Sequence, residues 1–541
     1  MANSIQLIIP MSGVGQRFIN AGYTDPKPMI LVDGYPIIKH VISLFPGSND
    51  INFICNEVHL SNTPMRSILE ALAPGCTIHS VPDSERMGPV DAVMRVAERL
   101  DDKRETIVSY CDYGSEWDYA GFLADVRRRG SDGAIACYTG FHPHMLGSDN
   151  YAFVQEHNGR VLEVREKQPF TDNKMAELAS NGSYYFKSGA LMKRYFAALM
   201  KDGPAVNGEF YVSLVYNEMV KDDLLISTFL IKKMLQWGTP YDLEIYRGWS
   251  RYFANIIVEQ PALPTDVETT LVLPMAGHGS RFSQRGYPVP KPFLDVNNAP
   301  MFVQAVNCLP PTSKQIFMCL NEHLASYDIN RTLERHYKGA VVVPIVKTTE
   351  GQACTCEIGL QETNFDLERP ILISACDNGV YFDTRKYAAL LEDVSIDVIV
   401  WSFRNNQTSK VNPHMYSWLD VDIEGRVRNV SCKKFIFDDP LKTHAIIGTM
   451  LFRKARYFME GLQLNYSQNR RTGDEFYVDD VLNRNIEAGL NVRVFEVENY
   501  ICWGTPDDYE TYQYWREFFD GCPWHPYSIE KDTTSIVKRR P

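Results

Sequence analysis

The sequence predicts an α/β protein made of two tandem domains, each a Rossmann-like three-layer α/β/α arrangement whose helices cover both faces of a mixed, mostly parallel sheet. Two observations predict this class. A short β-branched run leads straight into a glycine loop twice, at residues 5–15 and 270–279, as a buried parallel strand would. Landmarks also recur 264 to 266 residues apart, beginning with Gly13 and Gly277. So small a drift indicates two complete domains without large insertions.

Strands and helices are expected to alternate along each half. The apolar runs predict strands at 5–9, 52–55 and 106–109 in the first half, and at 270–273, 315–318 and 371–374 in the second. Helices are expected between them, for example at 90–100, and a helix-like run at 507–519 closes the second half. Because such sheets bind ligands at the carboxyl ends of their strands, the residues that follow these strands are the site candidates.

Composition and the repeat together predict the domain boundaries. Copy one is expected to span 1–255, and copy two is expected to span 268–520. The segment 256–267 contains two prolines among polar residues, which suits an exposed linker. Residues 521–541 have no counterpart in the first half and are predicted to form a tail.

Charge and hydropathy exclude several classes of partner. The chain of 541 residues has a net charge of -12, which argues against nucleic acid or an anionic membrane as the main partner. A local basic pocket for a small anion remains compatible with this charge. We expect no membrane insertion and a cytoplasmic location, because no apolar run approaches the roughly 18 residues of a membrane helix and no signal region is recognisable. A homo-oligomer is left open.

The first chemical element is the glycine loop, residues 12–17 in copy one and 276–281 in copy two. Its glycines allow backbone amides to approach a phosphate, and the following Arg17 or Arg281 supplies a fork of donors. The arginine stands where the dinucleotide fingerprint would continue toward a third glycine, so NAD binding is disfavoured. A plain structural turn is the alternative for a single loop, and the duplication argues against it.

Each glycine loop is followed by Pro-Lys-Pro, with Lys27 in copy one and Lys291 in copy two. The flanking prolines fix φ and present the ammonium as a held point charge. A solvated lysine in a polar turn is the alternative interpretation. Arginine, lysine and glycine amides converging on one place are typical of a triphosphate site.

These motifs resemble the sugar-1-phosphate nucleotidyltransferases, also called NDP-sugar pyrophosphorylases, whose signature is Gly-x-Gly-x-Arg followed by Pro-Lys-Pro. The resemblance covers both halves, so it implies two copies of a GT-A-like nucleotidyltransferase fold. The Pro-Met-Ser/Ala-Gly opening is similar to the variant members associated with capsule or surface polysaccharides. Further matches occur in family order at Gly88, Asp112, Glu166-Lys167, Gly182, Glu209 and Trp237, and at Gly351, Asp377, Lys433, Gly448, Glu475 and Trp503.

The resemblance implies a nucleoside triphosphate and a sugar or polyol phosphate as substrates, Mg2+ as cofactor and pyrophosphate as leaving product. The product would be an activated sugar or alcohol for polysaccharide or glycoconjugate synthesis. Implied catalytic residues are Arg17, Lys27, Lys167, Arg281, Lys291 and Lys433. Implied nucleotide-binding residues are Ser12, Gly13, Gly15, Gly88, Ala276, Gly277, Gly279 and Gly351. Implied acceptor-binding residues are Glu166, Gly182, Glu209, Gly448 and Glu475, and implied metal ligands are Asp112 and Asp377.

Alternative interpretations stand beside several of these roles. The two aspartates could cap turns, Glu209 and Glu475 could begin helices, and both tryptophans are expected in the core rather than against a ligand. One copy could be a silent nucleotide-binding or regulatory module. A glycosyltransferase that uses a finished nucleotide sugar is a third hypothesis, disfavoured because neither aspartate lies in Asp-x-Asp.

Departures from the family pattern leave the substrates open. The second metal ligand of many members is replaced by Gln236 or Cys502, and Cys432 stands in copy two where copy one has Glu166. The two acceptor pockets are therefore expected to differ. The glutamine common in uridylyl and thymidylyl members is Arg86 or Thr349, so the base is open among cytidine, uridine, thymidine and guanosine.

Overall fold

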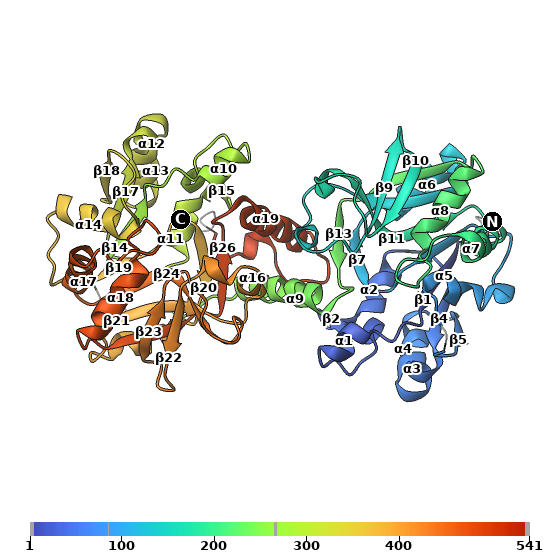
Figure 1. The fold of residues 1–541 in the computed structure, drawn as a ribbon, viewed down its shortest axis with the longest axis horizontal. Helices are drawn as coiled ribbons and strands as arrows, with labels where there is room; N and C mark the ends of the chain where they lie inside the picture. The colour runs from blue at the N-terminus through green and yellow to red at the C-terminus, as the bar shows by residue number, and fades with distance from the viewer. Residues whose placement is uncertain (1–4, 85, 264–267, 536–541) are drawn as a thin grey trace. The chain divides into compact units, whose positions relative to one another are not determined.

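The computed structural model describes residues 5–84, 86–263 and 268–535. The chain divides into two compact units, Met1–Arg247 and Gly248–Pro541 (Figure 1). The boundary falls inside helix α9 (Pro240–Asn255), eight residues before the end predicted for copy one. Part of the predicted linker and the end of the predicted tail lie outside the described residues.

Unit 1 is built on a nine-stranded sheet in the order β5-β4-β1-β6-β11-β8-β12-β10-β9. Within this sheet β10 and β11 run against the other strands, so the sheet is mixed and mostly parallel, as predicted. The strands are β1 (Gln6–Met11), β4 (Asp50–Asn56), β5 (Thr77–Val81), β6 (Thr106–Ser109), β8 (Gly133–Tyr138), β9 (Ala152–His157), β10 (Arg160–Glu166), β11 (Leu178–Phe186) and β12 (Ile226–Leu230).

Helices line this sheet. They are α1 (Gln16–Asn20), α2 (Ile37–Ser43), α3 (Glu57–Asn62), α4 (Met65–Leu72), α5 (Pro89–Met94), α6 (Tyr119–Arg129), α7 (Gly189–Asp202) and α8 (Val212–Lys221). Alternate strand residues such as Ile8 and Val108 pack with Phe196 of α7 and Val215 of α8 in one core. The helix predicted at 90–100 is wrong in its length, because α5 ends at Met94 and only a 3-10 turn follows.

Unit 2 repeats this topology. Its sheet runs β18-β17-β14-β19-β24-β21-β25, the order of the first seven strands of unit 1, and β22 pairs with both β24 and β23. The strands are β14 (Thr270–Met275), β17 (Lys314–Leu320), β18 (Val341–Ile345), β19 (Ile371–Ile373), β21 (Val398–Phe403), β22 (Trp418–Val421), β23 (Val427–Ser431), β24 (His444–Phe452) and β25 (Val492–Glu496).

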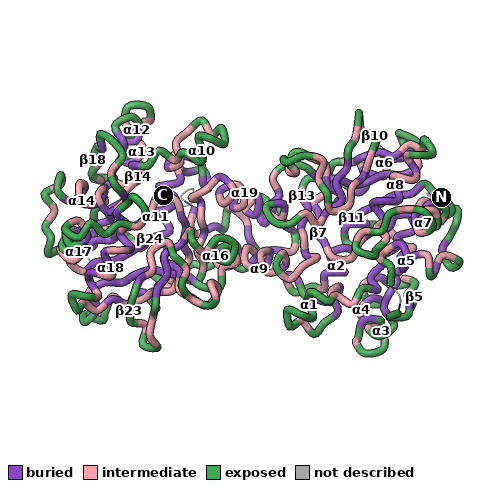
Figure 2. The backbone as a smooth tube through the Cα atoms, viewed as in Figure 1, coloured by how far each residue is buried: buried purple, intermediate pink, exposed green. Residues whose placement is uncertain are grey.

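Two hydrophobic cores lie on opposite faces of the second sheet, which establishes the three layers. Leu271 and Leu273 of β14 belong to one core, whereas Val272 belongs to the other. The central strands are buried along their length (Figure 2). The helices are α10 (Ser280–Gln284), α11 (Met301–Asn307), α12 (Asn321–Ser326), α13 (Ile329–His336), α14 (Gln352–Glu362), α15 (Thr384–Glu392), α16 (Gln407–Val411), α17 (Ala455–Ser467), α18 (Val478–Glu487) and α19 (Pro506–Asp520).

The described part of the predicted tail packs into unit 2. His525 bonds the carbonyl oxygen of Ser250 through Nε2 at 3.0 Å, and the backbone N–H of Thr533 donates to the Ile256 carbonyl at 2.9 Å. Asp532 is fully buried. The last turns of α9 and residues 521–535 are therefore structural parts of unit 2. Among the described residues, no helix is long and apolar enough to cross a membrane.

Candidate active site

Each glycine loop follows the first strand of its unit and brings a lysine close to its second glycine. Gly15 and Gly279 have φ values of 71° and 61°, a left-handed conformation that favours glycine. A Cβ on Gly15 would lie 3.5 Å from the Cβ of Lys27, and one on Gly279 would lie 3.0 Å from that of Lys291. The left-handed conformation explains why glycine occupies this position twice, and the tight approach at Gly279 adds a second reason in unit 2.

The lysine of each Pro-Lys-Pro segment pairs with the aspartate predicted as a metal ligand. Lys27 Nζ forms an ion pair with Asp112, and Lys291 Nζ lies 2.7 Å from Asp377 Oδ2. Burial opposes the charged form of each lysine, but the aspartate outweighs it and raises the pKa of both lysines. Lys291 in turn outweighs burial at Asp377 and lowers the pKa of that carboxyl. Both units therefore hold a charged pair beside the glycine loop.

The two aspartates are positioned by a two-stranded ladder outside the main sheet. In unit 1 it joins β7 (Tyr113–Glu116) to β13 (Lys233–Gln236), and in unit 2 it joins β20 (Asn378–Tyr381) to β26 (Asn499–Cys502). The backbone N–H of Trp237 donates to the Asp112 carbonyl at 3.2 Å, and that of Trp503 donates to the Asp377 carbonyl at 2.8 Å. Both indoles are fully buried, so the predicted core role of the tryptophans is confirmed.

Two side-chain oxygens converge on Gly238 in unit 1. A Cβ at this glycine would lie 2.9 Å from Asp112 Oδ2 and 3.0 Å from Gln236 Oε1. Mg2+ prefers oxygen ligands, and one or two carboxylates commonly hold it together with phosphate oxygens of the substrate. Asp112 and Gln236 are therefore the residues of unit 1 that would hold Mg2+; in this structure Asp112 pairs with Lys27, and Gln236 Oε1 accepts from Gly238 N–H at 3.0 Å.

In unit 2 the sulfur of Cys502 takes the place of the Gln236 amide oxygen, and Asp508 Oδ2 lies 3.4 Å from that sulfur. Asp377 Oδ2 and Cys502 Sγ lie 3.2 Å and 3.3 Å from the Cβ position of Gly504. Burial raises the pKa of the Cys502 thiol far above its usual range, so the sulfur stays protonated and suits Mg2+ poorly. Within the described residues, no cluster of three or more His, Cys, Asp or Glu side chains could hold a metal by itself.

The predicted nucleotide loop and acceptor segment are joined by backbone contacts in both units. Phe210 N–H donates to the Met87 carbonyl at 2.7 Å, and its own carbonyl accepts from Val90 N–H at 3.2 Å. A Cβ on Gly88 would lie 2.9 Å from the Phe210 backbone, and one on Gly351 would lie 2.5 Å from the carbonyl oxygen of Phe476. These glycines are required for the close approach.

The acceptor-side lysines share an unusual backbone conformation but have different partners. Lys167 and Lys433 have φ values of 59° and 52°, which are uncommon for residues other than glycine. Lys167 Nζ donates to the Tyr211 hydroxyl at 2.6 Å, which donates to Glu209 at 2.5 Å. Lys433 Nζ instead donates to the Met415 carbonyl at 2.7 Å. The two ammonium groups are therefore held differently.

The remaining predicted residues lie around these groups. Gly182 has a φ of 95° and stands where the β11–β8 register shifts, with its carbonyl accepting from Tyr110 N–H at 3.0 Å; Gly448 has a φ of 80° in β24. The Ser12 carbonyl accepts a hydrogen bond from Arg86 Nη1 at 3.3 Å, which links the glycine loop of unit 1 to the segment just before Gly88. Arg17 and Arg281 are exposed, as are Gly13, Gly277, Glu209 and Glu475, whereas Ala276 is buried.

Sequence reasoning missed two pairs of residues. Asn217 and Asn483 tie a helix to a strand beside the acceptor lysine, as described below. Asp242 and Asp508 lie in the first turns of α9 and α19. Each carboxylate accepts from the hydroxyl of the threonine three residues earlier, Thr239 or Thr505, and that hydroxyl accepts from the aspartate's backbone N–H. Burial raises the pKa of Asp242 to about 6 and also raises that of Asp508. The Thr-x-x-Asp spacing after each Trp-Gly could have revealed the second pair.

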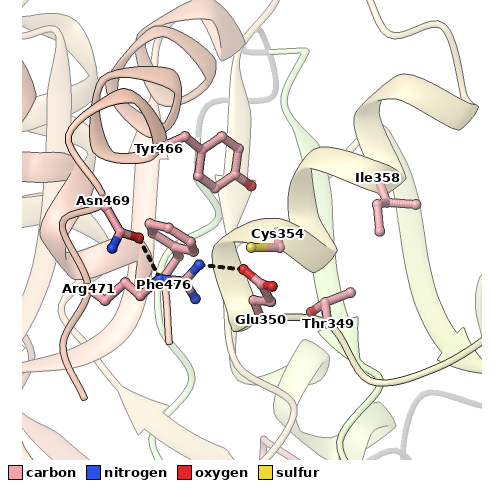
Figure 3. Close-up of a pocket in the computed structure, with 8 residues that line it drawn as sticks. All are labelled: Thr349, Glu350, Cys354, Ile358, Tyr466, Asn469, Arg471 and Phe476. Atoms are coloured by element: carbon pink, nitrogen blue, oxygen red, sulfur yellow. Dashed lines mark hydrogen bonds and ion pairs between the residues drawn. The ribbon is translucent and has the colours of Figure 1, made fainter. Parts of the chain in front are cut away.

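A cavity of about 400 Å³ borders the nucleotide loop of unit 2 (Figure 3). It is lined by Thr349, Glu350, Cys354, Ile358, Tyr466, Asn469, Arg471 and Phe476. Arg471 Nη2 lies 2.7 Å from Glu350 Oε2, and its guanidinium lies 4.2 Å from the ring centre of Phe476. The cavity lies between α14 and the segment that follows α17.

Comparison with known proteins defines the class of unit 1. Residues 7–217 match the family model described as Nucleotidyl transferase, so unit 1 carries a nucleotidyl transferase domain. Over 225 residues the chain is 24% identical to the Bifunctional protein GlmU of Saccharophagus degradans. This match covers 41% of the chain and 46% of that protein, so the chain spans less than half the length of this curated relative.

Solved structures are similar to less than half of the chain. A nucleoside-diphosphate-sugar pyrophosphorylase from Vibrio cholerae RC9 is 24% identical, with a TM-score of 0.36, over 44% of this chain and 98% of that chain. The inositol-1-phosphate CTP transferase from T. maritima is 13% identical, with a TM-score of 0.37, over 49% of this chain and 99% of that chain.

Proposed function

We propose that each unit transfers a nucleoside monophosphate from a nucleoside triphosphate to a sugar or polyol phosphate and releases pyrophosphate. The product would be an activated sugar or alcohol for polysaccharide or glycoconjugate synthesis. The observation that carries this proposal is the repeated pairing of a lysine, held against the second glycine of its loop, with an aspartate: Lys27 with Asp112 and Lys291 with Asp377. The family match of residues 7–217 supports the same reaction class.

In this reaction an acceptor phosphate oxygen attacks the α-phosphorus in line, and the bond from that phosphorus to the pyrophosphate oxygen breaks. No covalent bond to the protein is needed, so positioning and charge stabilisation supply the catalysis. In unit 1, Arg17 and Lys27 would neutralise the phosphates, and Lys167 would orient the acceptor phosphate. Mg2+ held by Asp112 and Gln236 would add charge neutralisation at the transferred phosphate. The corresponding residues of unit 2 are Arg281, Lys291, Lys433 and Asp377.

A silent unit 2 is a second candidate, and a specific observation favours it. Cys502 and Cys432 replace oxygen-bearing side chains of unit 1, and burial raises the pKa of both thiols, so both are neutral. In this candidate unit 2 would bind a nucleotide or regulate unit 1 without turnover.

The test is a screen of ATP, GTP, CTP, UTP and dTTP against sugar 1-phosphates and polyol phosphates, read as pyrophosphate release by the full chain. The Asp112→Asn, Asp377→Asn double variant is expected to lose this release. A matched control is Asp223→Asn, Asp420→Asn, which removes one exposed carboxylate from each unit. Release at the parent rate by the first double variant would contradict the mechanism.

A further inference from the structure

The acceptor side of unit 1 contains a carboxylate whose counterpart in unit 2 has changed element. In unit 1, Ser213 of α8 donates to Glu166 Oε2 at 2.6 Å, at the end of β10. The residues 266 positions later are Asp479 of α18 and Cys432, which follows β23. The strand side has therefore lost its acid, and the helix side has gained one.

The same two hydrogen bonds fix this helix on this strand in both units. Asn217 accepts from Val164 N–H and donates to the Val164 carbonyl, both at 2.8 Å. Asn483 accepts from Val430 N–H and donates to the Val430 carbonyl, both at 2.9 Å. Because these bonds set the register, position 432 faces position 479 as position 166 faces position 213.

A second acid accompanies the first. Asp480 stands where unit 1 has the buried Leu214, and it accepts from Thr472 Oγ1 at 2.8 Å. Burial, followed by the charges of Asp479 and Asp480, raises the pKa of the Cys432 thiol.

Asp479 itself is only 8% exposed. Within residues 268–535 no hydrogen bond or ion pair of its side chain is found. Its carboxylate oxygens are not among the fully buried, unpartnered side-chain atoms of the described residues, so they remain open to a bound molecule with hydrogen-bond donors. Lys433, which is proposed to orient the acceptor phosphate, directly follows Cys432, so the acids face the same segment of the chain.

We propose that Asp479 and Asp480 recognise the acceptor in unit 2 in place of Glu166, and that this acceptor presents hydroxyl or ammonium donors to two carboxylates. This inference rests on the proposed function of unit 2. Because buried polar groups discriminate strongly against substrates that leave them unpaired, the two units would select different acceptor phosphates.

The experiment uses the full chain with Lys27→Ala, which silences unit 1. Pyrophosphate release is measured with glucose 1-phosphate, glucosamine 1-phosphate and glycerol 3-phosphate, whose relative rates separate ammonium from hydroxyl recognition. In this background Asp479→Asn and Asp480→Asn are each expected to raise the acceptor KM by about 10-fold or more, while the KM for the nucleoside triphosphate changes less than about 2-fold. Asp420→Asn, an exposed carboxylate on β22, is the matched control and should change neither constant.

A double variant, Cys432→Glu, Asp479→Ser, recreates the arrangement of unit 1 in unit 2. This double variant is expected to shift the acceptor preference of unit 2 toward that of unit 1. The preference of unit 1 is measured separately, in a chain that carries Lys291→Ala. Unchanged acceptor KM values in both single variants, with unchanged melting temperatures, would overturn the inference. If the Lys27→Ala chain binds nucleoside triphosphate but releases no pyrophosphate with any acceptor, the proposed function of unit 2 fails first and the inference fails with it.

Discussion

Replacing Phe253 by alanine should destabilise unit 2, although this residue precedes the predicted linker. Phe253 is fully buried, and its ring centre lies 6.2, 5.3 and 4.7 Å from those of Tyr512, Phe519 and Tyr527. Truncation of a buried phenylalanine costs about 3–5 kcal/mol. A domain of this size loses about 2–4 °C of melting temperature per kcal/mol, so the expected loss is about 6–20 °C.

Calorimetry of the full chain measures this shift once the transitions are assigned. Phe196→Ala truncates a buried ring that packs against Phe186 in unit 1, and it marks the transition of that unit. Val258→Ala is the control, because Val258 is 54% exposed and should shift neither transition appreciably. If Phe253→Ala and Phe196→Ala lowered the same transition, the assignment of the end of α9 to unit 2 would be refuted. A cut near Pro261 should likewise damage unit 2, whereas a cut after Arg247 keeps its core intact.

Three further predictions concern the site. Lys27→Ala and Lys291→Ala should each lower pyrophosphate release by their own unit about 10²–10³-fold, so the rate left in each single variant reports the other unit. Cys502→Gln gives unit 2 the amide oxygen that unit 1 has, so its half-saturating Mg2+ concentration should fall; an unchanged value argues against Gln236 as a ligand. The pKa of Asp242, about 6, lies above its unfolded value of 3.8, so folded unit 1 binds more protons than the unfolded chain between these values. This contribution to stability is present below pH 3.8 and is lost as pH rises through 6, and Asp242→Asn should flatten that pH dependence in urea unfolding.

Sequence patterns predicted the strands and helices whose ends are set by neighbouring residues. The strand predicted at 106–109 is β6 itself, because four buried residues between polar segments define both ends. The helix predicted at 90–100 ends early because the chain leaves the helical conformation at Val96, although apolar residues continue to Leu100. No turn residue marks that stop, so the pattern could not reveal it. The packing of residues 521–535 was also hidden, because its partners are distant in sequence.

The candidate site likewise contains some residues that local sequence motifs predict and others that only the fold brings together. The glycine loops and the Pro-Lys-Pro lysines are contiguous motifs, so their residue types alone predicted a phosphate site. The pairing of Lys27 with Asp112 joins positions 85 residues apart, and only the order β1-β6 of neighbouring strands brings them together. The bonds of Asn217 to Val164 required the helix to be placed on the strand first. Asparagine has no sequence signature for that role.

The two units act as internal controls for each other, and the pattern of their differences bears on whether unit 2 is active. A site without function would be expected to lose polar groups one by one, without compensation. Cys502 fits that expectation. Across the helix–strand contact, however, the acid lost at Cys432 is matched by the acid gained at Asp479, while the asparagine bonds that align them are kept. The ion pair of Lys291 with Asp377 is also kept. Paired changes of this kind favour two sites with different acceptors over one active and one retired copy.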